Sequence, residues 1–459
     1  MPFDPIIAEV RFGCGLSPGQ APAGSVSDML ARLEGPDAAA EAWPVEAFAQ
    51  FQERTAQAFE LRRMRAKNRG TAIAKDAVKQ WRQVKKAARL GQDRWMAQSL
   101  MRRASTADGF RERLAGFWAD HFTAIGKAGV LKFGAAPYVE TSVRPYMTGH
   151  FAAMLRACVT APLMIHYLDQ ERSMGPGSIR AIKRGGKAGL NENLAREVLE
   201  LHTLGVGAAY SQADVREFAE LLAGVSYRPD QGFRFRADYA EPGAETVLGV
   251  SYGGPGKARL EDVFAALDDL SVHPATARHI SSKLAVHFVG DRPSEALIAQ
   301  MTATYQATDG LLSEVYRTML EHPDAWAMPG NVKPPIDFVG SALRALAVPA
   351  LPVRQVRELR LMLRQPMALM GQDWERPDGP DGWPEEDGDW ITPQRLAARL
   401  QWALNVPPVL ADPLPDPRDF VTAALGREPP EALRFAARAA ETRAEGIALI
   451  LASPSFQRT

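Results

Sequence analysis

Apolar residues recur every three to four positions through much of the chain, which is the period of a helix with one buried face. The clearest case begins near residue 190. Asn191 is a residue type that caps helices, and Leu194, Val198 and Leu201 follow it on one stripe. The spacing predicts a helix over 191–204 with these three apolar side chains in the core.

A second helix is expected directly afterwards. Gly205 stands where helices commonly end in a left-handed residue, and Val206 is placed to pack back on Leu201. Ser211 and Asp214 have the spacing of a capping box, which opens a helix over 211–223. Two helices joined by so short a loop form an αα-hairpin.

Helix-forming residues dominate elsewhere, and strand patterns are rare. Alternation at 233–236, a turn at 241–243 and apolar residues at 246–248 predict one small hairpin. The segment 371–392 is rich in proline and glycine and carries three tryptophans, so it is expected to be an irregular loop. The predicted fold is mainly α, a multi-helical globular unit with a small β-hairpin around 230–250. Helical patterns cover 50–115, 138–170, 190–224, 260–325, 335–365 and 393–452.

Composition is that of a globular protein. Of the 459 residues, 46% are hydrophobic and 24% are charged, which excludes disorder, fibres and coiled-coil rods. Cys14 and Cys158 are the two cysteines, too few for a disulfide scaffold or a cysteine-rich metal site. The first thirty residues show no signal-peptide pattern, and no apolar run reaches the ~20 residues of a membrane span. A cytoplasmic protein without a membrane span is expected.

Charge is balanced overall, with 54 basic and 54 acidic residues, but it is segregated locally. Residues 54–113 carry 17 basic and five acidic side chains, a net charge of +12. Residues 373–389 carry eight acidic side chains and one basic one. A basic block of this kind binds phosphate or anionic polymers, or forms a solvated helical face that can oppose the acidic loop. Aromatic residues are sparse in the block, so the solvated face is favoured and nucleic acid is not an expected partner.

Candidate chemistry starts on the 191–204 helix, where Asn193, Glu197 and Glu200 share one face while His202 points elsewhere. Such carboxylates can serve acid–base chemistry or, with a ligand such as Asp120 or His121 from another helix, hold a hard cation. The alternative is a salt-bridged face. A histidine–lysine stripe at His279, Lys283 and His287 and the basic loop Lys183, Arg184 and Lys187, a candidate anion site, are further candidates.

Two segments carry a resemblance to a known family. Residues 117–122 read Phe-Trp-Ala-Asp-His-Phe, and residues 191–205 read Asn-Glu-Asn-Leu-Ala-Arg-Glu-Val-Leu-Glu-Leu-His-Thr-Leu-Gly. Both are very similar to the signature blocks of the domain of unknown function (DUF) 1800 family. Shorter blocks occur in the family's order from 11–13 to 453–457. The resemblance therefore implies one family unit over 1–459, with possible subdomains 1–115, 116–330 and 331–459.

The resemblance implies a mainly helical protein without an established activity. Relatives are often encoded beside proteins of the sulfatase and alkaline-phosphatase type (DUF 1501), and many have an export signal, so an envelope location is an alternative to the cytoplasm. This chain departs from the pattern at three positions. Val225 stands where relatives tend to have tryptophan, and Ala240 and Glu245 stand where they tend to have histidine and lysine.

Two functions are open at this point. The first is an accessory or scaffold protein that acts with a partner of the sulfatase or alkaline-phosphatase type through charged and tryptophan-bearing surfaces. The second is a hydrolase that uses a polar cluster of Asp120, His121, Glu197, Glu200 and His202.

No cofactor is indicated. Glu197 and His202 are five residues apart, about 140° apart around a helix, so one metal ion could not readily bind both. A hydrogen-bonded cluster without a metal is expected, with Glu197 oriented by Arg196 or Asn193.

Overall fold

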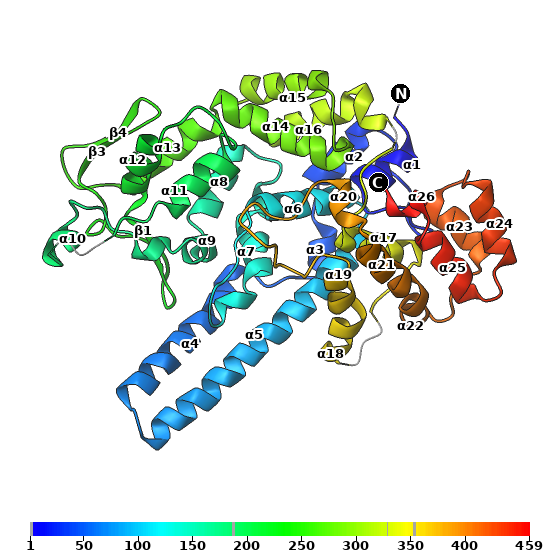
Figure 1. Cartoon of the computed structure of the whole chain (residues 1–459), viewed down its shortest axis with the longest axis horizontal. Helices are drawn as coiled ribbons and strands as arrows, with labels where there is room; N and C mark the ends of the chain where they lie inside the picture. The colour runs from blue at the N-terminus through cyan, green and yellow to red at the C-terminus, as the bar shows by residue number, and fades with distance from the viewer. Residues whose placement is uncertain (1–2, 186–188, 328, 352–354) are drawn as a thin grey trace.

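The computed structural model describes residues 1–459 except 1–2, 186–188, 328 and 352–354, and it is mainly helical, as predicted (Figure 1). The elements of the first part of the chain are α1 Pro5–Ile7, η1 Ala8–Phe12, α2 Val26–Glu34, α3 Ala38–Ala42, α4 Phe48–Lys67, α5 Ala72–Ser105 and α6 Gly109–His121. This part includes the projecting arm of Figure 1, which is formed by α4 and α5.

The middle of the chain contains all the strands and a first set of packed helices. Its helices up to the strands are η2 Leu131–Phe133, α7 Ala135–Ser142, η3 Arg144–Tyr146, α8 Phe151–Val159, α9 Pro162–Tyr167, η4 Gln170–Arg172, α10 Ile179–Lys183, α11 Asn193–Glu197, η5 Val198–His202 and α12 Gln212–Leu222. The strands and following helices are β1 Val225–Arg228, β2 Gly232–Phe235, β3 Gly243–Val247, β4 Val250–Gly254, α13 Leu260–Ser271, α14 Pro274–Val289, α15 Glu295–Ala307, α16 Leu312–Glu321 and η6 Pro323–Trp326.

The last part is again helical, interrupted by the loop 371–386. Its elements are α17 Pro335–Ala345, α18 Val356–Leu359, η7 Arg360–Arg364, α19 Gln365–Leu369, α20 Asp387–Trp390, α21 Pro393–Asn405, α22 Pro407–Leu410, α23 Pro417–Leu425, α24 Glu431–Ala439, α25 Arg443–Leu451 and α26 Pro454–Gln457. No helix in the described parts of the chain is long and apolar enough to cross a membrane.

Two hydrophobic cores are joined by α5 and α17. One core is built from residues between Ala8 and Trp326, and the second combines the end of α5 with residues from Ile336 to Phe456. Every residue of α17 is buried. At Gly340 a Cβ atom would come within 2.8 Å of the Arg103 side chain, so glycine allows α5 to cross α17 closely.

A buried ion network fixes this crossing. Asp337 of α17 pairs with Arg103 of α5 at 3.2 Å and with Arg113 of α6 at 3.3 Å. Burial alone would raise the pKa of Asp337, but the two guanidinium groups outweigh it and hold this pKa below its ordinary value. Arg344, about two turns after Asp337 on the same helix, donates to the carbonyl groups of Gly15 and Thr106.

The αα-hairpin is present, and its capping box between Ser211 and Asp214 is confirmed. Asn191 accepts a hydrogen bond from the backbone of Asn193 at 3.0 Å, so it supports the start of α11. The C-terminal packing is different from the prediction, because Val206 is 78% exposed and does not cover Leu201.

The buried stripe of this helix also differs at its end. Leu194 and Val198 are fully buried as predicted, but Leu201 is only half-buried, and Leu199 is buried instead. The reason is that η5 is a π-helical turn. A π turn adds a residue to the turn and shifts the residues after it around the axis, so a strict 3.6-residue period fails here.

The small β region consists of two hairpins instead of one. β1 pairs with β2, and β3 pairs with β4, each antiparallel. The predicted pairing of 233–236 with 246–248 is wrong, because 233–235 pair with 225–227 and 246–247 pair with 250–251. Local turns at 229–231 and 248–249 close each hairpin, which needs no long-range pairing.

The basic block is mostly a solvated helical face. In the arm formed by α4 and α5, the basic side chains near the connecting turn are exposed. Arg102, Arg103 and Arg113 are the exceptions, since they are buried at the body. Among the described residues, the acidic segment forms no ion pair with the basic side chains of the block. Its ion pairs join Glu385 to Lys283, Asp373 to Arg364 and Arg376, and Asp387 to Arg458.

The π turn gives a direct stability prediction. We expect Leu199→Ala to cost about 2–5 kcal/mol, because it removes a fully buried side chain and leaves a cavity. Leu201→Ala should cost less than Leu199→Ala, since the Leu201 side chain is only partly buried. Thermal or denaturant unfolding of the two variants checks this. An equal loss in both would mean that the stripe follows a regular helix.

Candidate functional site

A cavity of about 220 Å³ lies where the three parts of the chain meet. Helices α5, α6, α7, α14 and α17 provide its walls, and the loop that follows α19 covers it. Its lining includes Arg103, Asp120, His287, Asp337 and Trp374. The ion network that fixes the α5–α17 crossing therefore also forms part of the cavity wall.

The tryptophans of the acidic loop face this cavity. Trp374, Trp383 and Trp390 all line it, and Trp390 is almost fully buried. The loop was expected to offer tryptophans on a surface. They are instead folded inward, which gives the cavity aromatic walls suited to a ligand with an apolar part.

Asp120 holds the loop in place. Its Oδ1 atom accepts a hydrogen bond from the backbone of Trp383 at 2.8 Å. Gly382 has a φ of 87° and lies so close to Asp120 that a Cβ atom would come within 2.5 Å of the carboxyl group. The left-handed backbone and the close approach both require glycine at this position.

Burial and the surrounding charges raise the pKa of Asp120 into the range in which it can exchange a proton at neutral pH. Burial raises the pKa of Asp120 to about 7, and the acidic side chains of Glu385 and Asp381 add to the rise, while the Trp383 amide and Lys283 oppose it. Lys283 lies 3.3 Å from Glu385, across from this carboxyl group. A carboxyl group with a pKa near 7 can both accept and return a proton at neutral pH.

Nε2 of His287 and Nε1 of Trp374, both on the cavity wall, are buried and have no hydrogen-bond partner among the described residues. Burial, together with the nearby Arg113, lowers the pKa of His287 to about 3, so its ring is neutral. Buried polar atoms are normally paired, and these two mark positions where a ligand or water would be bound.

Three histidines form a neutral cluster behind Asp120. Nε2 of His121 donates to the His202 carbonyl at 3.2 Å, and Nε2 of His279 donates to the Leu201 carbonyl at 3.1 Å. Burial, with Lys283 nearby, lowers the pKa of His202 to about 3 and that of His121 well below its usual value. The π turn leaves these two carbonyl groups free, and the histidines satisfy them.

Glu197 and Glu200 lie away from the histidines. Arg196 pairs with Glu200 at 3.2 Å and with Glu192 at 3.5 Å, so it does not orient Glu197 as predicted. Burial, with the carboxylates of Glu200 and Asp381, raises the pKa of Glu197 to about 7. The negative charge of Asp381 contributes to the raised pKa of both Glu197 and Asp120.

The candidate anion site is only partly described. Lys183 ends α10 and Arg184 follows it, both exposed, while Lys187 lies outside the described residues. The N-terminus of α11 starts at Asn193, several residues further on. The anion site stays a prediction for Lys183 and Arg184.

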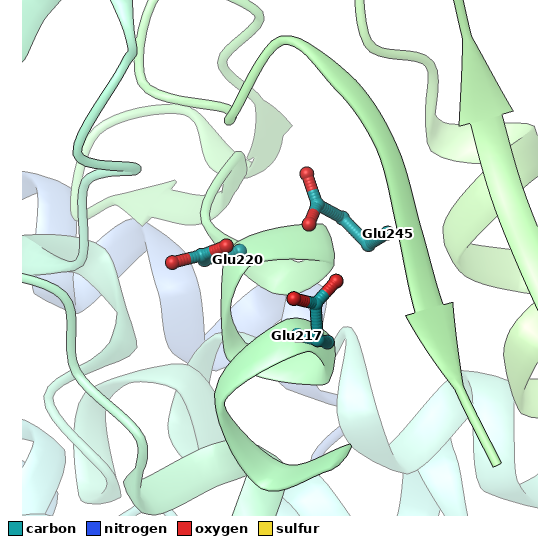
Figure 2. Close-up of side chains that lie close together, drawn as sticks. All are labelled: Glu217, Glu220 and Glu245. Carbon is teal, nitrogen blue, oxygen red and sulfur yellow. The ribbon is translucent and has the colours of Figure 1, made fainter. Parts of the chain in front are cut away.

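An acidic cluster that the sequence reasoning did not anticipate lies beside β3 (Figure 2). Carboxylate oxygens of Glu217, Glu220 and Glu245 all lie within 4.8 Å of one another. Burial, with the neighbouring glutamates, raises the pKa of Glu245 to about 8. Arg216 offsets part of the charge through its 3.1 Å ion pair with Glu220. The signal in the sequence was Glu245 itself, at a position where a lysine was expected.

These features define a class of protein: a helical protein with a mainly apolar cavity, carrying a few polar groups, at the junction of its parts. The family model described as "Protein of unknown function (DUF1800)" matches residues 10–458, and the chain belongs to this family. The resemblance seen in the sequence is thereby confirmed over nearly the whole chain. No curated protein and no solved structure matches the chain.

The acidic cluster yields a prediction for stability against pH. Because the pKa of Glu245 is raised on folding, the parent protein loses stability as pH rises from about 4.5 to 8. We expect Glu245→Gln to remove this loss and to raise the melting temperature by a few °C at pH 9, equivalent to about 1–2 kcal/mol.

The control is Glu53→Gln, which removes an exposed carboxylate on α4. The gain of Glu245→Gln over the parent should shrink toward pH 4, because the Glu245 carboxyl group of the folded parent is then protonated and as neutral as the glutamine that replaces it. A constant difference between pH 4 and pH 9 would contradict the raised pKa.

Proposed function

We propose that this protein is a hydrolase whose reaction takes place in the cavity beside Asp120. The observation that carries the proposal is a carboxyl group with a pKa of about 7 on the wall of a cavity covered by an aromatic loop. Perturbed carboxyl groups in cavities are typical of acid–base sites. Two unpaired polar atoms, on His287 and Trp374, are available to position a substrate.

In the proposed reaction, Asp120 accepts a proton from a water molecule as the water oxygen bonds to the electrophilic centre of the substrate. The leaving group departs with the bonding electron pair and takes the proton back from Asp120. Lys283, held by Glu385, supplies positive charge near the negative charge that develops. Atoms and protons balance without a further reactant.

The other candidates have supporting roles in this proposal. His121 and His279 are positioning residues, because their ring nitrogens donate to the carbonyl groups of His202 and Leu201 in the π turn. Glu197 shapes the charge around the loop through Asp381. Glu200 forms an ion pair with Arg196 and is assigned no part in proton transfer.

The accessory role is a second candidate. It is favoured by the burial of both signature histidines, His121 and His202, neither of which lines the cavity. In that case the histidine cluster stabilises the fold, and the protein acts by binding a partner of the sulfatase or alkaline-phosphatase type. Co-purification of the two proteins, with the complex kept in Asp120→Asn, would support this role over the hydrolase.

Asp120→Asn tests the hydrolase proposal. Asparagine can still accept the hydrogen bond from Trp383 but cannot take up a proton. With ester, phosphate-ester and glycoside substrates, we expect the rate to fall by at least about 100-fold. The rate of the parent protein should rise with pH and level off above about pH 7, as Asp120 ionises.

The matched control is Asp378→Asn, an exposed aspartate in the same loop, which should keep the parent activity. Melting curves of both variants report whether the fold is intact. Equal rates in the parent and Asp120→Asn, or no turnover of any of the three substrate classes, would contradict the proposal.

A further inference from the structure

Helices α4 and α5 form an arm that projects from the body (Figure 1). α5 alone has 34 residues, a length of about 50 Å. The far end of the arm, here called the arm tip, is the segment 62–79 around the turn between the two helices. It carries seven basic side chains and one acidic one, Asp76. The bases are Arg62, Arg63, Arg65, Lys67, Arg69, Lys75 and Lys79.

A hollow lies between the two helices at the arm tip. Four of the bases line it: Arg62, Arg65 and Arg69 of the first helix and its turn, and Lys75 of the second. Within the described residues, none of the four side chains takes part in an ion pair or a hydrogen bond. A neighbouring arginine outside the hollow does form an ion pair: Arg63 lies 3.2 Å from Glu60.

The backbone adds to this positive charge. Gly70 and Thr71, which line the hollow, lie at the start of α5, whose N-terminal amide groups carry partial positive charge. Four unpaired cations around a helix N-terminus repel one another and favour a bound anion with several oxygen atoms. A phosphate group has this chemistry.

The arm tip also exposes apolar side chains. Met64 is 45% exposed, three residues before the end of α4, and Ile73 is 52% exposed, at the second position of α5. Apolar side chains contribute little to binding a nucleic-acid backbone or a free phosphate ion, which require charge alone. At a membrane surface they enter the boundary of the acyl chains, while bases bind the headgroups.

We propose that the arm tip docks on an anionic membrane surface, with lipid phosphate groups in the hollow and with Ile73 and Met64 entering the interface. The protein then binds the membrane peripherally, and its body and cavity are held away from the bilayer by the length of the arm. This docking is independent of the proposed hydrolase reaction, because no residue of the arm tip lines the cavity.

Vesicle sedimentation of the full chain tests the proposal. The probes are phosphatidylcholine vesicles with and without about 30% phosphatidylglycerol, at low and high salt. We expect the bound fraction to rise at least about tenfold with phosphatidylglycerol and to fall in high salt. The triple variant Arg62→Gln, Arg65→Gln, Arg69→Gln should lose this binding, and Ile73→Ser should weaken it several-fold.

The matched control lies on the shaft of the same arm. Arg82→Gln, Lys86→Gln and Arg89→Gln together remove the same charge from exposed positions nearer the body, and should keep most of the binding. Both triple variants should melt like the parent protein, since none of the six side chains is buried.

Three outcomes would overturn the proposal. Equal losses in the two triple variants would show a general effect of charge without a site at the tip. Binding to duplex RNA or DNA that is stronger than to the vesicles and unaffected by Ile73→Ser would identify the arm as a nucleic-acid contact. Release from vesicles by millimolar glycerol phosphate would show a site for a soluble phosphate compound.

Discussion

The close crossing of α5 and α17 is the interaction on which the rest of the structure depends. Asp337 is buried between Arg103 and Arg113, and an unpaired carboxylate at this depth would be strongly destabilising. Gly340 lets the two helices approach, and Arg344 donates to the carbonyl groups of Gly15 and Thr106. Because α5 belongs to both hydrophobic cores, this crossing links the start of the chain to its end.

The cavity is a consequence of that link. Helices on either side of the crossing cannot fill the space above the ion network, and the loop after α19 closes over it. The loop is held by the hydrogen bond from Trp383 to Asp120, by the close approach of Gly382 and by the ion pairs of Glu385 with Lys283 and of Asp373 with Arg364. The same burial that makes the loop stable there raises the pKa of Asp120, so the packing and the proposed chemistry have one physical cause.

The π turn has a similar double effect. It interrupts the backbone hydrogen bonds of the signature helix, and His121 and His279 supply donors to the carbonyl groups left over. Their burial keeps them neutral, which is the state in which a ring nitrogen can donate to one carbonyl without a charge in the core. The basic side chains of the arm tip differ from these histidines, since they are exposed to water and none of them lines the cavity. The fold thus separates an interior in which the histidine cluster is neutral and the Asp337 carboxylate is paired from a projection whose basic side chains around the hollow are unpaired among the described residues.

The sequence by itself determined the helices, the capping box at Ser211 and the family, because these depend on local periodicity, on residue types at caps and on long contiguous blocks. It did not determine that Leu199 replaces Leu201 in the core, since the π turn is stabilised by tertiary partners, His121 and His279, which donate to its last carbonyl groups. The pairing of Asp120 with the loop at Trp383, 263 residues away, was also decided by the tertiary structure. A loop without periodicity has no local signal for its position, which is fixed by the cavity and the carboxyl group that it covers.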